Sequence, residues 1–108
     1  MTKSVTSDAV TVKVTLRHSN NHGSIEGYAR DAVSTLSKYY HEPLNCHVIL
    51  DHQKNDHDQN KVAEITVHVP HHDFVARESA PTYEQGIDNC IDVLSRQLKK
   101  LKEKQRNI

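Results

Sequence analysis

Residues 82–104, TYEQGIDNCIDVLSRQLKKLKEK, decide the architecture because their apolar side chains recur at steps of three and four. At about 100° per residue this spacing makes one narrow stripe, which is typical of an amphipathic helix packed on another layer. The stripe consists of Tyr83, Ile87, Ile91, Leu94, Leu98 and Leu101. Basic residues lie opposite the stripe or on its flank: Arg96, Lys99, Lys100, Lys102, Lys104 and Arg106. The helix therefore has one face for burial and another that carries positive charge into solvent.

Upstream of this helix, alternating apolar and polar residues predict four strands. They fall in residues 9–17, 45–53, 61–69 and 73–79. Residues 24–40 instead have helical periodicity, with Ser24 in the first turn and Pro43 beyond the end. Thr82 is suited to cap the last helix, since Pro81 disfavours helix before it.

The predicted order is therefore strand, helix, three strands, helix. Each helix has a single apolar stripe and each strand a single apolar face, so the simplest burial places both helices on one face of a four-stranded sheet. We expect an α+β two-layer sandwich, with the later strands antiparallel. Residues 9–104 should form one domain, between a flexible N-terminus at 1–8 and a tail at 105–108.

The 108-residue chain has a formal net charge of +0 and a pI near 7.1, whereas nucleic-acid-binding domains usually have a basic excess. The charges are nevertheless segregated. Acidic residues cluster in 51–58 and 84–92, and from Arg96 onward only Glu103 opposes the basic ones. The sequence contains no signal-peptide pattern and no apolar run of the ~18 residues that a membrane span needs, so we expect a soluble cytoplasmic protein.

Nothing in the sequence indicates an enzyme. The chain has no nucleophile elbow, no metalloprotease motif and no C-x-x-C, and its three glycines form no phosphate-binding loop. Cys46 and His47 are adjacent, but neighbours on a strand point to opposite faces. Cys46 and Cys90 are expected to be buried free thiols. We predict no catalytic residue, no cofactor and no small-molecule substrate.

Histidine and carboxylate residues crowd one strand, its loop and the following hairpin. They are His47, Asp51, His52, Asp56, His57, Asp58, His68, His71 and His72. These side chains are competent zinc ligands, but none of their spacings matches a closed metal site. We therefore predict a solvated polar loop rather than a metal centre.

Two interpretations of the basic helix end remain open from the residues alone. Lysine and arginine in a last turn complement the helix dipole, so a solvated face explains much of the pattern. However, like charges at i, i+3 and i+4 repel each other, and the run continues to Arg106. A polyanion such as a phosphate backbone would relieve that repulsion.

Residues 87–104, IDNCIDVLSRQLKKLKEK, resemble the second helix of the ribosome hibernation-promoting factor family, which includes ribosome-associated inhibitor A. That helix typically has the pattern I-D-x-x-I-D-x-L-x-R-Q-L-x-K-x-K. The order of elements is similar to the family's β-α-β-β-β-α fold, which looks like a double-stranded-RNA-binding domain. The sequence KYY at 38–40 also resembles the family's first-helix end, and the likeness covers nearly the whole chain.

The resemblance implies binding to the small ribosomal subunit, in the decoding region where mRNA and tRNAs would sit, and inhibition of translation in starved or stationary-phase cells. It implies rRNA contacts by basic residues of both helices. Carried over, these are Arg96, Lys100, Lys102 and Lys104, with Lys99 adding charge and the first helix offering Arg30 and Lys38. The first helix departs from the family, which is often richer in lysine there. The chain ends soon after the motif, so it resembles the short, monomeric form.

A different class of function also fits the sequence. In a regulatory interaction module, the charged helix face would bind an acidic protein partner, or the open sheet face with Lys13, Arg17 and Arg77 would support dimerisation. Tyr39 and Tyr40 leave a second alternative open, because they can stack on RNA or pack in the core.

Overall fold

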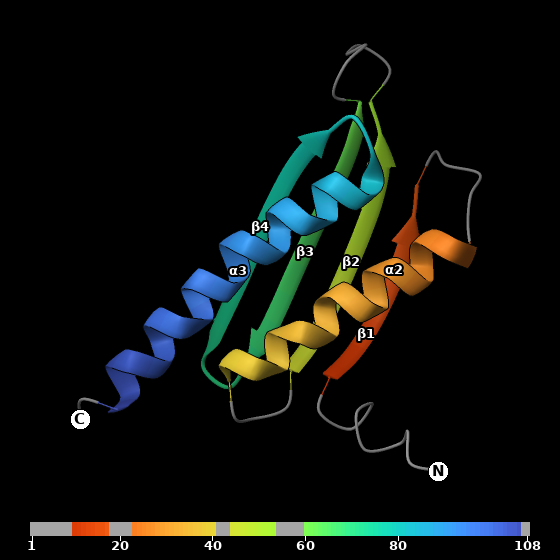
Figure 1. Cartoon of the computed structure of the whole chain (residues 1–108). Coiled ribbons are helices and arrows are strands. Elements are labelled where there is room, and N and C mark those ends of the chain that lie inside the picture. The colour runs from red at the N-terminus through yellow and green to blue at the C-terminus, as the bar shows by residue number, and fades with distance from the viewer. Residues whose placement is uncertain (1–9, 18–22, 41–43, 54–59, 107–108) are drawn as a thin grey trace.

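A computed structural model of the chain describes residues 10–17, 23–40, 44–53 and 60–106 (Figure 1). The strands are β1 (Val10–Leu16), β2 (Leu44–His52), β3 (Lys61–Val69) and β4 (His72–Ala80). The helices are α2 (Gly23–Ser34), which continues as the 3-10 helix η1 (Thr35–Tyr39), and α3 (Tyr83–Arg106). The predicted β-α-β-β-β-α order and the α+β class are confirmed.

The four strands lie in the sheet in chain order, β1-β2-β3-β4. β1 and β2 are parallel, because α2 carries the chain back to the end of the sheet where β1 began. The other two pairs are antiparallel, as predicted. One row across the sheet shows the register: Val14 pairs with Val48, Val48 with Ile65, and Ile65 with Ala76. All four side chains contribute to the core.

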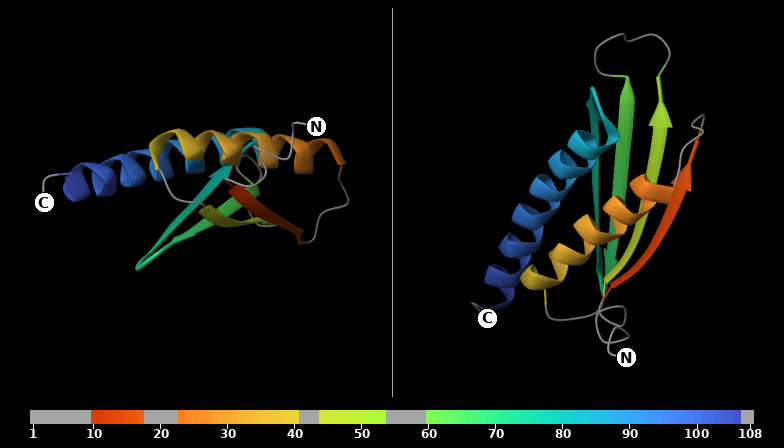
Figure 2. Two further views of the ribbon diagram at one scale, coloured as in Figure 1. Left: turned by 90° about the horizontal axis from the view of Figure 1, so that it is seen from below. Right: turned by 45° about the vertical axis from the view of Figure 1, so that its right-hand side comes forward.

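Both helices cover the same face of the sheet, so the predicted two-layer sandwich is confirmed (Figure 2). The core lies between the two layers. Its fully buried members come from α2, η1, β2, β3 and α3: Val33, Leu36, Leu44, Val48, Leu50, Ile65, Val67, Ile87, Leu94 and Leu98. The apolar residues of β1 after Val10 are only partly buried, because β1 is an edge strand. No helix within the described ranges is long and apolar enough to span a membrane.

The first helix differs from the regular α-helix expected over residues 24–40. α2 ends at Ser34 and a 3-10 turn completes it. The physical reason lies in its hydroxyl side chains: Ser34, Thr35 and Ser37 donate hydrogen bonds of 2.8, 2.6 and 2.9 Å to carbonyls of the preceding turn. Such bonds compete with the backbone donors of the helix and favour a tighter turn.

The start of α3 is fixed by its cap and by close contact with the sheet. The backbone N–H of Gln85 donates to Thr82 Oγ1 at 3.1 Å, which confirms Thr82 as the N-cap. Gly86 is buried where the helix meets β3, and a Cβ atom there would lie 3.3 Å from the Cβ of Ala63. Glycine at this position lets the helix approach the sheet closely.

Two glycine-to-alanine substitutions should therefore have opposite effects on stability. Gly27→Ala meets no atom within 4 Å and should stabilise the fold by about 0.5–1 kcal/mol, the usual gain in helix propensity. Gly86→Ala makes the same gain but forces the helix away from β3, a strand paired on both sides, and overpacking of this kind costs about 1–3 kcal/mol. Urea unfolding of both variants measures the difference, and equal stabilisation by the two would contradict the close packing.

Candidate nucleic-acid interface

Cationic side chains gather where η1 meets the C-terminal turns of α3. Lys38 of η1 and Lys99 and Lys102 of α3 line a shallow hollow of about 190 Å³, together with Tyr39 and Glu103. The Nζ atom of Lys99 lies 5.9 Å from the centroid of the Tyr39 ring, within the range of a cation–π contact. The Tyr39 ring therefore helps to hold the ammonium group of Lys99 at the surface. Lys38, on the same 3-10 helix as Tyr39, supplies a second ammonium group to this hollow.

Two more lysines lie on the opposite flank of the same turns of α3. Lys100 and Lys104 line a second hollow, against the start of β4. Figures 1 and 2 show these turns, in dark blue, extending beyond the edge of the sheet, so the helix is accessible on both flanks. We call the five side chains Lys38, Lys99, Lys100, Lys102 and Lys104 the basic end.

Arg96 lies one turn before the basic end and has a partner of its own. Its guanidinium forms an ion pair with Asp92, four residues earlier on α3. Both side chains are well exposed, and a pair of this kind contributes only about 0.3–0.5 kcal/mol. A phosphate group can therefore compete for Arg96.

Arg30 lies apart from the basic end. Its Nη1 donates a hydrogen bond of 2.8 Å to the carbonyl oxygen of Val12 on β1. β1 is the sheet edge opposite to β4, the strand against which α3 packs. Arg30 thus satisfies an acceptor of an edge strand, and its predicted contact with RNA remains a prediction.

The groove between the two helices carries the opposite charge. It has a volume of about 600 Å³ and is lined by the carboxylates of Asp31, Asp88 and Asp92 together with Tyr28 and Tyr39. The Tyr28 hydroxyl donates a 2.7 Å hydrogen bond to Asp88 Oδ1, which ties α2 to α3. This bond raises the pKa of Tyr28 above its usual value, since the phenol must keep its proton to donate. The helical layer is therefore acidic in this groove and cationic at its basic end.

Comparison with known proteins identifies the family. The family model described as sigma 54 modulation protein / S30EA ribosomal protein matches residues 12–106. The chain belongs to this family. A curated relative is the ribosome hibernation promoting factor of Acidithiobacillus ferridurans, 31% identical over 77 residues that cover 71% of this chain and 97% of the relative. The resemblance drawn from the second-helix motif is thereby confirmed.

Solved structures show the same fold at lower identity. The N-terminal domain of Protein Y from Thermus thermophilus superimposes with a TM-score of 0.72 at 21% identity, over 84% of this chain and 98% of that one. A ribosomal subunit interface protein from Coxiella burnetii gives 0.69 at 17% identity, over 86% and 98%. At these identities the likeness supports the architecture alone.

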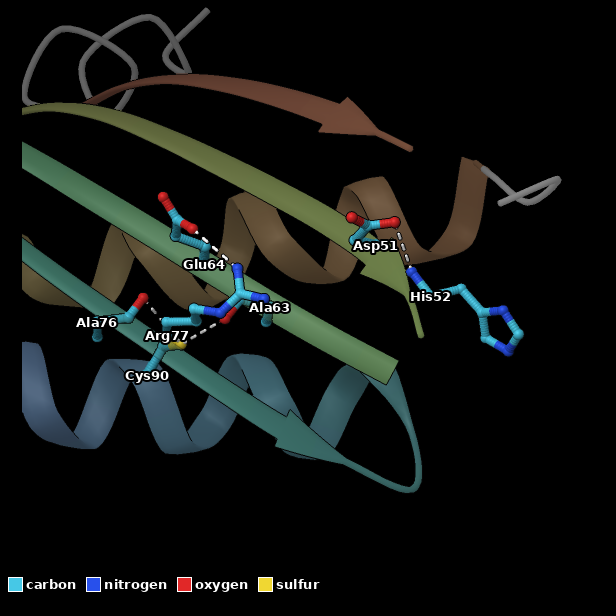
Figure 3. Close-up of polar contacts among 7 residues, drawn as sticks. All are labelled: Asp51, His52, Ala63, Glu64, Ala76, Arg77 and Cys90. Atoms are coloured by element: carbon cyan, nitrogen blue, oxygen red, sulfur yellow. Dashed lines mark hydrogen bonds and ion pairs between the residues drawn. The ribbon is translucent and has the colours of Figure 1, made fainter. Parts of the chain in front are cut away.

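In this member of the S30EA family, the two thiols are structural. Cys46 and Cys90 are buried and free, and burial raises the pKa of each to about 12. The Cys90 thiol contacts the carbonyl oxygens of Ala63 and Ala76 at 3.3 and 3.5 Å (Figure 3). His47 lies on the open face of the sheet, where its Nε2 is 2.9 Å from Thr15 Oγ1. The side chains of Cys46 and His47 therefore do not face each other.

The open face of the sheet carries polar pairs instead of a single sign of charge. Arg77 of β4 reaches Glu64 of β3 at 3.2 Å, as Figure 3 shows, and His68 lies 2.7 Å from Asp73. The described residues contain no group of three or more potential metal ligands. Asp56, His57 and Asp58 of the predicted polar loop lie outside the described residues, as does the side chain of Arg106.

Sequence reasoning found the lysines but missed their surroundings. It did not foresee that Tyr39 would lie beneath Lys99, that β4 would flank Lys100 and Lys104, or that three carboxylates would line the groove. Of the two adjacent tyrosines, Tyr40 is buried in the core and Tyr39 is half-buried at the surface. The sequence contained part of the signal for the acidic groove, because Asp31, Asp88 and Asp92 all lie off the apolar stripes. It did not show that the two helices pack side by side and so bring these carboxylates together.

Proposed function

We propose that the protein silences idle ribosomes by binding the small subunit in the mRNA–tRNA channel, through contacts of its basic end with the rRNA backbone. Membership of a family with a curated relative named ribosome hibernation promoting factor supports the biological role. The observation that carries the mode of binding is the convergence of lysines from η1 and α3 at one projecting end of the molecule. The protein acts in the cytoplasm as a monomer.

The proposed mechanism is steric and electrostatic, with no chemical step. The sheet holds the two helices at a fixed spacing, and the basic end lies along phosphates of the small-subunit rRNA. Arg96 can bridge phosphate oxygens with two donors once it leaves Asp92, whereas each lysine acts as a point charge. Recognition then depends on the shape and backbone of the RNA, and occupation of the channel excludes mRNA and tRNA.

The acidic groove limits this contact to one part of the helical layer. Asp31, Asp88 and Asp92 would repel phosphates placed between the helices. We therefore expect α3 to meet the RNA with its last turns, rather than with its full length. Arg30, on the far side of α2, should contribute little, and Arg30→Ala should change ribosome affinity less than Lys100→Ala.

Sedimentation with purified ribosomal subunits tests the proposal. The protein should pellet with small subunits and not with large ones. With about 4–6 phosphate contacts, its affinity should fall roughly 10²–10³-fold between 50 and 200 mM salt. Messenger RNA and tRNA bound beforehand should prevent binding. Absence of the protein from small-subunit pellets at low salt would contradict the proposal.

The main alternative is an acidic protein partner at the same basic end. It predicts a similar dependence on salt, because the same lysines would be used. The two proposals differ in one respect: nuclease-treated subunits should lose the protein if the ligand is rRNA and retain it if the ligand is a ribosomal protein.

A further inference from the structure

Two stacked aromatic rings lie beside the basic end. Binding to a phosphate backbone would need the lysines but not these rings. His72 and Phe74, two residues apart at the start of β4, lie with their ring centroids 6.1 Å apart and their planes 11° from parallel. Both face the helical side of the sheet, beneath the projecting turns of α3. Phe74 also packs against the core, so its ring is held in place from one side.

These rings form the floor of the second hollow at the basic end. The hollow measures about 240 Å³, below the ~300–1,000 Å³ of pockets for drug-sized ligands, and its lining is mainly apolar. Its other walls are Gln97, Lys100, Leu101 and Lys104. The hollow therefore combines a mainly apolar lining with two lysine side chains one helical turn apart.

The Gln97 side chain in the same hollow has an unsatisfied hydrogen-bond acceptor. Among the described residues its Oε1 atom is buried and has no hydrogen-bond partner. An unsatisfied buried acceptor costs about 1–3 kcal/mol. A rotation that turns the amide toward a ligand in the hollow would recover that cost, provided that the ligand offers a donor.

We propose that this hollow takes one unpaired nucleobase of RNA. The base stacks on Phe74, Lys100 and Lys104 hold the phosphates on either side of it, and the Gln97 amide bonds to its polar edge. The chemistry fits a nucleotide because a base combines an aromatic face, polar edges and flanking negative charge. This inference rests on the proposed function and makes it more specific: the backbone contacts gain one anchor at a bulged or looped-out nucleotide.

The other hollows of the helical layer suit a base less well. In the hollow between η1 and α3, the face of Tyr39 is already covered by Lys99 and the rim includes Glu103. The groove between α2 and α3 is lined by three carboxylates, which oppose the phosphates of any nucleotide. Among the three hollows described here, only the one over Phe74 has cationic side chains and no carboxylate in its lining.

A pair of RNA hairpins tests the proposal. One carries a single bulged 2-aminopurine, and the other has the same base paired within the stem. The wild-type protein should bind the bulged hairpin about tenfold more tightly, and stacking should quench its fluorescence. Phe74→Leu keeps an apolar side chain but removes the stacking face, so it should abolish the preference and the quenching while leaving affinity for the paired hairpin unchanged.

Val75→Ala is the matched control, because Val75 is the next residue on β4, lies on the opposite sheet face and is 53% exposed. Circular dichroism must show that Phe74→Leu is folded, and Lys104→Gln provides a second variant that leaves the ring intact and should weaken both hairpins. Equal affinity of the wild type for both hairpins, or an unchanged preference in Phe74→Leu, would overturn the base site. If small-subunit binding with its steep salt dependence persists in either case, the proposed function stands without it.

Discussion

Replacing Lys100, Lys102 and Lys104 together by glutamate should abolish co-sedimentation with small ribosomal subunits and leave the circular dichroism spectrum unchanged. The triple reversal replaces three of the proposed attractive contacts with repulsive ones, and removing even three phosphate contacts lowers the salt-dependent part of the affinity steeply. Lys100 and Lys104 are exposed and Lys102 is half-buried, and none of them forms an ion pair with another described residue. The fold therefore does not depend on their charge.

A matched charge reversal elsewhere separates a local effect from a general one. Lys13→Glu with Arg17→Glu changes two exposed cations, one on β1 and one directly after it, away from the basic end, and should leave binding nearly intact. Lys100→Glu with Lys104→Glu changes the same number of charges at the basic end and should clearly reduce binding, although by less than the triple variant does. A triple variant that still pellets with small subunits would show that α3 does not make the contact.

Leu94→Ala and Leu98→Ala should each destabilise the fold by about 2–5 kcal/mol. Both side chains have no solvent exposure and lie in the core between α3 and the sheet. Truncation removes buried apolar surface and leaves a cavity that a close-packed core cannot fill. Since a small domain is stable by only about 5–15 kcal/mol, either change takes a large share of its stability.

Thermal and urea unfolding measure this effect, and an exposed position on the same helix supplies the control. Lys100→Ala removes an exposed side chain and should change the free energy of unfolding by less than about 0.5 kcal/mol. Unchanged melting temperatures in both leucine variants would contradict the packing of α3 on the sheet. Folded Leu94→Ala should still pellet with small subunits, because the basic end is not part of the cavity.

The architecture was predictable because its signals are local and agree with one another. Period-two patterns located the strands, and the spacing from Ile87 to Leu101 fixed both the helix and its buried face. The break in the first helix was not predictable from periodicity, since the hydroxyls of Ser34, Thr35 and Ser37 act on the backbone without disturbing the apolar stripe. Such competition is decided by local hydrogen bonds, which a hydrophobic pattern does not record.

The candidate site was predictable only in part, for a related reason. The lysines of α3 share one helix, so a helical wheel places them. The residues that line the hollows and the groove together with α3 come from other elements: Tyr39 from η1, Phe74 from β4 and Asp31 from α2. Their positions depend on the sheet register and on the packing of two helices, which sequence spacing alone does not supply.

The acidic groove and the basic end place opposite charges on different parts of a protein whose formal net charge is +0. A protein with a formal net charge of +0 should bind nucleic acid only weakly in a non-specific way, because attraction at its basic end is offset by repulsion at its acidic groove. Near a large polyanion, however, the field exerts a torque that turns the positive pole forward before contact. For the proposed contact with rRNA, the encounter should be oriented as well as attractive, and the association rate constant should decline with ionic strength even though the formal net charge is +0.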